Sequence, residues 1–177
     1  PAYGELELLG VDIDTTPCSL SFAETVTYLA DRVAGYDVVV SCQDVADIYP
    51  ALERLHWHPP LIEYGCLVAE AMAGPKHLTT RYVGRSPEVR EAAAARVSGR
   101  EGHAIHIPYG GKGPEIVGMW MSLFQEVVRQ HEAAPAPGLF RSRCQGGFEC
   151  SSHRLPSGRR LDVLAASGHV LNAMSDY

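Results

Sequence analysis

Short apolar runs rich in β-branched residues alternate with amphipathic stretches through most of this chain, and that alternation limits the fold more than any other feature. Residues 36–42, 77–84 and 103–107 have the length and composition of short strands. Between and after them, apolar residues recur at the spacing of one helix face, most clearly over 115–129. This pattern predicts an α/β fold in which a Rossmann-like parallel sheet is flanked by helices.

Capping residues and prolines mark where the predicted helices begin and end. Ser21 and Glu24 have the spacing of a capping box. The run Ser86-Pro87-Glu88 supplies a capping hydroxyl, a proline in the first turn and an acid near the helix N-terminus. Pro50 must kink the helical-looking stretch 45–55 or mark its boundary.

Two further segments are predicted from their apolar residues. Residues 5–13 mix apolar and acidic residues and could form a strand. Residues 61–73 form an apolar, alanine-rich run that resembles an amphipathic core helix, which Gly74-Pro75 ends. Within that run, Cys66 is most simply a small core residue.

Composition excludes some classes of function. The 177 residues carry 15 basic and 21 acidic side chains, a net charge of −6, which argues against a nucleic-acid binder that relies on phosphate contacts. No apolar run approaches the ~18 residues needed to span a bilayer, so we expect no membrane span. The five cysteines are sparse and odd in number, which favours reduced thiols and a cytoplasmic location.

The segment 62–73, followed by 78–84 and by Ser86-Pro87-Glu88-Val89, resembles the donor-binding half of the retaining two-domain (GT-B) glycosyltransferases of family 4. The shared features are an aromatic-glycine turn, a helix with the run Glu-Ala-Met-Ala, a strand and a Pro-Glu helix start. This resemblance implies that residues 1–131 form a nucleotide-sugar-binding domain. It also implies transfer of the sugar to a carbohydrate or small-molecule acceptor, with no further cofactor.

The same resemblance suggests which residues bind the donor. Glu70 would accept hydrogen bonds from both ribose hydroxyls, and Gly65 would let the backbone approach the ligand closely. Glu63 and Glu88 are further donor-binding candidates. In the family a first Glu lies eight positions before the second, where this chain has Ile62, so Glu63 is one position away from the pattern.

A second resemblance covers residues 139–177. The run from Phe140 to Arg154 is similar to the opening of the (β/α)₈ barrel of family 1 glycosidases, and residues 132–138 have the composition of a linker. This implies a partial second α/β segment in which Gln145, Glu149 and His153 contact sugar. The paired carboxylates of such enzymes lie on later strands, beyond this chain.

Other functions remain open at this point. His56 with His58, and His103 with His106, could serve a metal-dependent hydrolase, completed by a carboxylate such as Glu63. A glycoside hydrolase-like fragment and a non-catalytic binding domain are two more alternatives. We expect part of a carbohydrate-active protein, with a nucleotide-sugar glycosyltransferase favoured and no bound metal.

Overall fold

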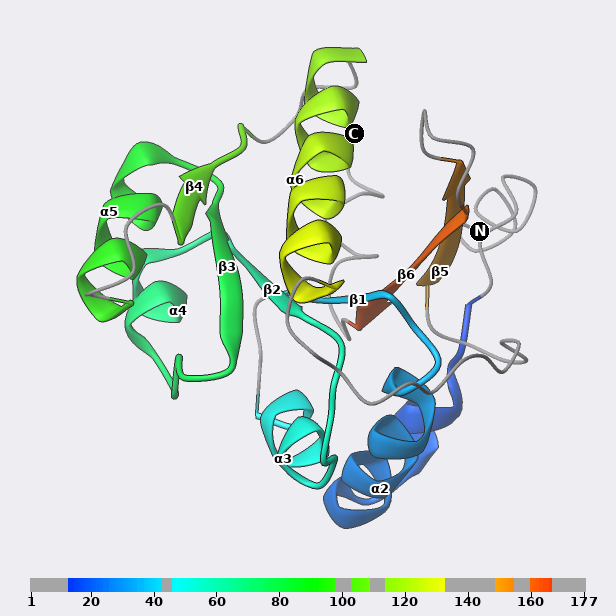
Figure 1. The fold of residues 1–177 in the computed structure, drawn as a ribbon. Helices are drawn as coiled ribbons and strands as arrows, with labels where there is room; N and C mark the ends of the chain where they lie inside the picture. The colour runs from blue at the N-terminus through cyan, green and yellow to red at the C-terminus, as the bar shows by residue number, and fades with distance from the viewer. Residues whose placement is uncertain are drawn as a thin grey trace.

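The structure is a computed structural model that describes residues 13–42, 46–97, 103–108 and 114–132, together with the backbone of strands 149–154 and 160–166. Helices and strands alternate along most of this length, as Figure 1 shows. In chain order the elements are η1 (Thr16–Ser19), α2 (Phe22–Val33), β1 (Val38–Cys42), α3 (Ile48–Glu53), β2 (Leu61–Gly65), α4 (Val68–Met72), β3 (Thr79–Gly84), α5 (Pro87–Arg96), β4 (Ala104–His106), α6 (Pro114–Glu132), β5 (Glu149–Arg154) and β6 (Arg160–Ala166).

The six described strands form one sheet in the order β4-β3-β2-β1-β6-β5. Strands β1 to β4 are parallel to their neighbours, β6 runs parallel to β1, and β5 pairs antiparallel with β6. A parallel sheet flanked by helices is the α/β fold that the alternation predicts, so that prediction is confirmed.

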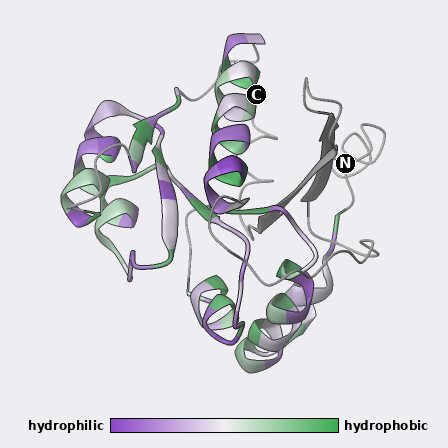
Figure 2. Cartoon of the chain, in the orientation of Figure 1, coloured by the Kyte–Doolittle hydropathy of each residue, from purple (hydrophilic) through white to green (hydrophobic). Residues whose placement is uncertain are grey.

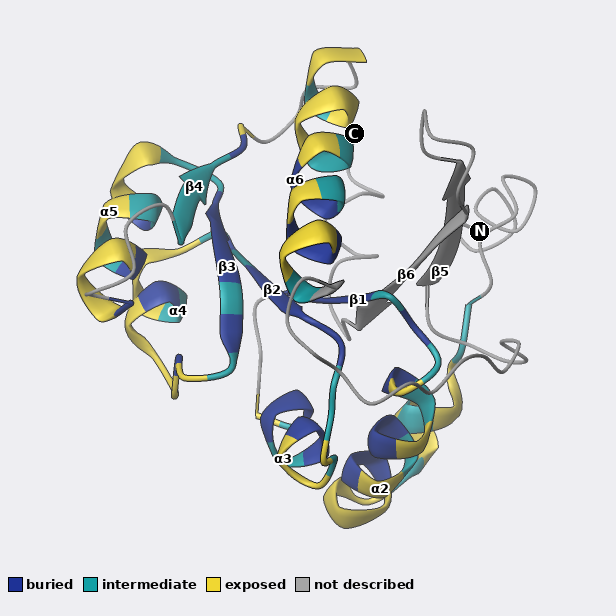
Figure 3. Cartoon of the chain, in the orientation of Figure 1, coloured by how far each residue is buried: buried dark blue, intermediate teal, exposed yellow. Residues whose placement is uncertain are grey.

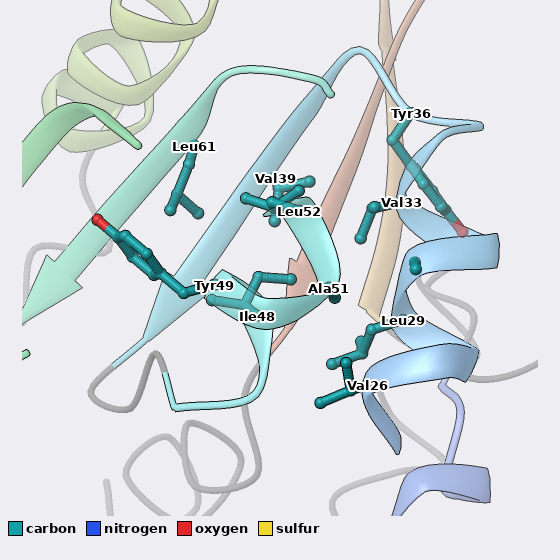
Figure 4. Close-up of a cluster of buried hydrophobic side chains, with 11 residues drawn as sticks. Val26, Leu29, Val33, Tyr36, Val39, Ile48, Tyr49, Ala51, Leu52 and Leu61 are labelled. Carbon is teal, nitrogen blue, oxygen red and sulfur yellow. The ribbon is translucent and has the colours of Figure 1, made fainter. Parts of the chain in front are cut away.

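Helices cover both faces of the sheet, and the alternation of side chains along each strand explains how. Val39 and Leu61 point to one face, where they pack against α2 and α3 (Figure 4). Val40 and Ile62, one position along, point to the opposite face and pack against α6. Figure 3 shows buried strands beneath helices with exposed outer sides, and in Figure 2 apolar and polar residues alternate around α6. Each fully buried aliphatic side chain contributes about 1.5–3 kcal/mol.

The helix boundaries follow the capping signals. The Oε2 atom of Glu24 accepts a hydrogen bond from the backbone N–H of Ser21 at 2.9 Å, which completes the predicted capping box. The Ser86 hydroxyl accepts from the backbone N–H of Val89 at the start of α5. Pro50 lies in the first turn of α3, where the missing N–H would have had no partner within the helix. It therefore marks a boundary instead of a kink.

The prediction of a helix over residues 61–73 is wrong for its first part. Residues 61–65 form strand β2, and only 68–72 form the short helix α4. The reason is that β2 lies between β1 and β3 and is buried on both faces, so its burial does not alternate, and Glu63 is its one charged residue. A short continuous apolar run of this kind cannot be told from a buried helix by its periodicity.

The C-terminal part of the chain also differs from the expectation of a separate second segment over 139–177. Strand β6 pairs with β1, so β5 and β6 form an antiparallel pair that extends the same sheet. Strand β1 is buried along its whole length, which is expected when it has a partner on both sides. The predicted linker 132–138 lies outside the described residues except for Glu132, which ends α6.

Two more sequence expectations concern the N-terminal segment and the absence of a membrane span. The proposed strand over 5–13 lies outside the described residues apart from Ile13. Within the described part of the chain, none of the helices combines the length and the apolarity needed to cross a bilayer.

Candidate functional site

A pocket of about 350 Å³ lies where strands β1 and β2 approach their carboxyl ends. In parallel α/β sheets, ligands bind in crevices beyond these ends, because the loops there are free to diverge. Its walls come from strands β1, β2 and β3, from the segment after β1, from α4 and from the turn that follows α4. The lining residues are Ser41, Ala46, Glu63, Tyr64, Glu70, Ala73, Gly74, Pro75, Lys76 and Tyr82.

Strand register explains why three of these side chains share one side of the sheet. Ser41 on β1 is paired with Glu63 on β2, and Glu63 is paired with Tyr82 on β3. Residues that are in register on parallel strands point to the same face. Ile62, where the glycosyltransferase family has its first Glu, faces α6 on the opposite side of the sheet.

Glu63 is the centre of a buried polar cluster. Its Oε2 atom accepts a hydrogen bond from Lys76 Nζ at 2.8 Å, and its Oε1 atom accepts from the hydroxyls of Tyr49, at 3.0 Å, and Thr79. The hydroxyl of Tyr49 reaches this cluster from α3, and Figure 4 shows its ring extending toward β2. Burial raises the pKa of Tyr49, so its hydroxyl stays protonated and able to donate.

The ion pair between Glu63 and Lys76 is enclosed, since both side chains are only 5% exposed. A buried ion pair is tolerated when further hydrogen bonds satisfy both charges. Here the Lys76 ammonium also donates to the carbonyl oxygen of Ala73 at 2.8 Å and lies over the ring of Tyr82. Glu63 therefore lines the pocket as the sequence suggested, while both of its carboxylate oxygens are bound by the protein itself.

Glu70 has a different arrangement. Its Oε2 atom accepts hydrogen bonds from the backbone N–H groups of Cys66 and Leu67, at 2.7 and 2.9 Å, and so caps the start of α4. No hydrogen bond joins its Oε1 atom to another residue in the described part of the chain. One oxygen thus fixes the carboxylate in place and the other is available on the pocket wall.

Two glycines shape the site for different reasons, which the sequence alone did not distinguish. A Cβ atom on Gly65 would overlap the hydroxyl of Tyr82, so this position keeps room for a protein side chain. The sequence argument had reserved that room for a ligand. Gly74 has a φ of 63°, a left-handed conformation that favours glycine, and it turns the chain from α4 toward Lys76.

The structure does not bring the remaining predicted residues into this pocket. Glu88 lies exposed in the first turn of α5, away from the lining residues, and a hydrogen bond from Ser86 lowers its pKa. Glu149 and His153 belong to β5, of which only the backbone is described. Gln145 lies outside the described residues.

The two histidine pairs form no metal site with the other residues that the structure describes. In the described part of the chain no group of three or more His, Cys, Asp or Glu side chains is placed to hold a metal ion. The Nδ1 atom of His58 lies 2.8 Å from the carbonyl oxygen of Pro59, and the Nε2 atom of His106 lies 3.2 Å from that of Arg85. The rings of His58 and His106 thus each contact a backbone oxygen.

Sequence reasoning missed Lys76 and Tyr82. The alternation along residues 79–84 places Tyr82 and Gly84 on one side of a strand, which is a usable signal, although it does not say which side faces the site. Lys76 follows Gly74-Pro75, and nothing in the neighbouring sequence distinguishes it from an ordinary loop lysine.

Comparisons with protein-family models, with curated proteins and with solved structures give no match to this chain. Both resemblances drawn from the sequence therefore stay predictions, and the argument for function depends on the pocket.

Proposed function

We propose that this chain binds a nucleotide-sugar donor and contributes the donor-binding part of a glycosyltransferase. The observation that supports the proposal most is Glu70, whose Oε2 atom is held by two backbone N–H groups while its Oε1 atom lies on the wall of a pocket at the strand ends. The acceptor, a carbohydrate or other small molecule, would be bound by a part of the protein beyond the described residues.

The chemistry of a ribose suits this carboxylate. A ribose carries two neighbouring hydroxyls, and a carboxylate oxygen has two lone pairs that can accept a hydrogen bond from each. Because Glu70 is already oriented by Cys66 and Leu67, little side-chain freedom is lost when a ligand binds. Hydrogen bonds to a charged group are worth about 1.5–3 kcal/mol each.

Glu63 has a supporting role in this proposal. It holds the ammonium group of Lys76 at the pocket. Because the two charges are opposite, the pair adds no net charge to the pocket wall. We infer a cytoplasmic setting for the protein, since Cys18 and Cys66 both carry free thiols.

The test is isothermal titration of the chain with UDP-glucose and with GDP-mannose. We expect one of the two to bind, and we expect Glu70→Gln to weaken that binding about tenfold or more. The amide of Gln retains one oxygen that can cap α4, so this variant separates ligand binding from folding better than Glu70→Ala does.

Glu91→Gln is the matched control, because Glu91 is 70% exposed on α5 and does not line the pocket. Equal binding by the wild type and by Glu70→Gln, with Glu91→Gln also unchanged, would remove Glu70 from the site. Donor binding without transfer to any acceptor would favour a non-catalytic binding domain.

A further inference from the structure

The hydroxyl of Tyr82 reaches the pocket, and none of the described residues bonds to it. The residue is 1% exposed, its hydroxyl lies against Gly65, and its side chain lines the pocket. No hydrogen bond joins this hydroxyl to any of the residues that the structure describes. Because a buried ring holds this hydroxyl at the pocket wall, the hydroxyl is oriented to form a hydrogen bond with a ligand there.

The groups around Tyr82 determine which ligand chemistry fits. Burial, reinforced by the nearby carboxylates of Glu63 and Glu70, raises the pKa of Tyr82 and keeps its phenol protonated. Tyr82 is therefore a hydrogen-bond donor, whereas the Oε1 atom of Glu70 is an acceptor. A ligand hydroxyl can accept from the first and donate to the second, because it has both a lone pair and a proton.

The charge of the pocket disfavours a phosphate inside it. Among the described residues that line it, Glu63, Glu70 and Lys76 are charged, which leaves one net negative charge from this part of the chain. The Lys76 ammonium is already paired with Glu63 at 2.8 Å and with the carbonyl of Ala73, so its charge is largely neutralised. A phosphate would bring further negative charge close to Glu70, and like charges in a partly enclosed site repel strongly.

The size of the pocket points the same way. Its volume of about 350 Å³ is near the lower end of the 300–1,000 Å³ that is typical of small-molecule sites. A single five- or six-membered ring fits such a space better than a complete nucleotide sugar does.

We propose that this pocket is a subsite for a neutral ring that carries neighbouring hydroxyls, with Tyr82 donating a hydrogen bond to one hydroxyl oxygen and Glu70 accepting from a hydroxyl proton. Tyr82 thus determines specificity by its hydrogen bond to a ring hydroxyl, and phosphate groups stay outside the pocket. The inference deepens the proposed function, on which it rests for identifying the ring as the ribose of the donor.

The experiment compares wild type, Tyr82→Phe and Tyr28→Phe in isothermal titrations. The probes are UDP, its 2′,3′-dideoxy form, free D-ribose and D-glucose, and inorganic pyrophosphate. We expect UDP to bind more tightly than the dideoxy form, and we expect Tyr82→Phe to weaken UDP about two- to tenfold while leaving the dideoxy form unchanged. Pyrophosphate should not compete with UDP for the pocket.

The unfolding stability of Tyr82→Phe is a second measurement. A tyrosine whose hydroxyl had only a structural role would lose stability on this substitution. The hydroxyl of Tyr82 makes no hydrogen bond to the described residues, so its removal should leave the urea midpoint unchanged or raise it. Tyr28→Phe is the matched control, because the Tyr28 hydroxyl accepts from Arg32 on α2, outside the pocket lining. It should not alter ligand binding.

Each result bears on either this inference or the proposed function. Competition by pyrophosphate, or UDP binding that Tyr82→Phe does not change, overturns the inference, and the proposed function stands if Glu70→Gln still weakens UDP-glucose. Binding of free ribose or glucose that Tyr82→Phe weakens, with no binding of any nucleotide, supports the inference and overturns the proposed function. A wild type that binds none of the probes overturns both.

Discussion

Removal of the Lys76 ammonium tests whether the polar cluster beneath the pocket is as enclosed as the structure indicates. Lys76→Met keeps most of the side-chain volume and leaves the Glu63 carboxylate with the hydroxyls of Tyr49 and Thr79 as its partners among the described residues. At 2.8 Å the attraction between the two charges is about 6 kcal/mol at an effective dielectric constant of 20, before the cost of removing them from water. Loss of one partner of a buried pair typically costs about 3–5 kcal/mol. We expect a loss in that range.

The assay is urea unfolding of four proteins: the wild type, Lys76→Met, Glu63→Gln and the double variant. The double variant removes both charges and keeps an amide oxygen for the Tyr49 and Thr79 hydroxyls, so it should lose much less stability than Lys76→Met alone. The difference between the double variant and the two single variants measures the coupling of the pair.

An exposed pair provides the comparison that could refute this reasoning. Arg90 and Glu91 lie 3.7 Å apart with exposed side chains, and Glu91→Gln should cost less than about 1 kcal/mol. If Lys76→Met proves no more costly than Glu91→Gln, water must reach the Glu63–Lys76 pair, and the argument for an enclosed cluster fails.

Three further predictions concern close packing and protonation. Gly65→Ala should destabilise the protein by about 1–3 kcal/mol. The added methyl group would overlap the Tyr82 hydroxyl and lie 2.8 Å from the ring carbon that bears this hydroxyl. An unchanged urea midpoint would contradict this prediction. Gly84→Ala should cost at least as much, since its Cβ would lie 2.5 Å from the backbone nitrogen of Arg90, which cannot move without α5; thermal unfolding measures the loss. Burial lowers the pKa of His131, so the unfolded chain binds the proton more readily, and the contribution of this histidine is present above its unfolded pKa of about 6.5 and is lost as the pH falls below that value. Urea titrations at pH 7.5 and 5.5 should therefore show a smaller decrease for His131→Asn than for the wild type, and equal decreases would refute this assignment.

Local signals in the sequence predicted much of the fold. The capping box at Ser21 and Glu24 and the helix start at Ser86 each involve contacts within four residues. They can therefore be predicted without any tertiary information. The amphipathic stretch over 115–129 and the β-branched run over 36–42 likewise correspond to α6 and β1.

The candidate site was only partly predictable. Glu70 and Glu63 were named from the sequence and both line the pocket. Their contacts were not foreseen, because the resemblance treated Glu63 as a ligand residue while the structure pairs it with Lys76. Glu88 was named for its place in a Pro-Glu helix start, and capping within its own helix accounts for that pattern.

By itself the sequence determined most of the order of strands and helices, most helix starts and the α/β class, since these depend on periodicity and on contacts between near neighbours. Tertiary structure alone decided that residues 61–65 form a strand, because burial on both faces erases the alternation that would have revealed it. It also decided which side of that strand carries Glu63 and that Tyr82 and Lys76 meet it there. Strand register brings such distant side chains together, and a shift of one residue would have sent Glu63 to the opposite face.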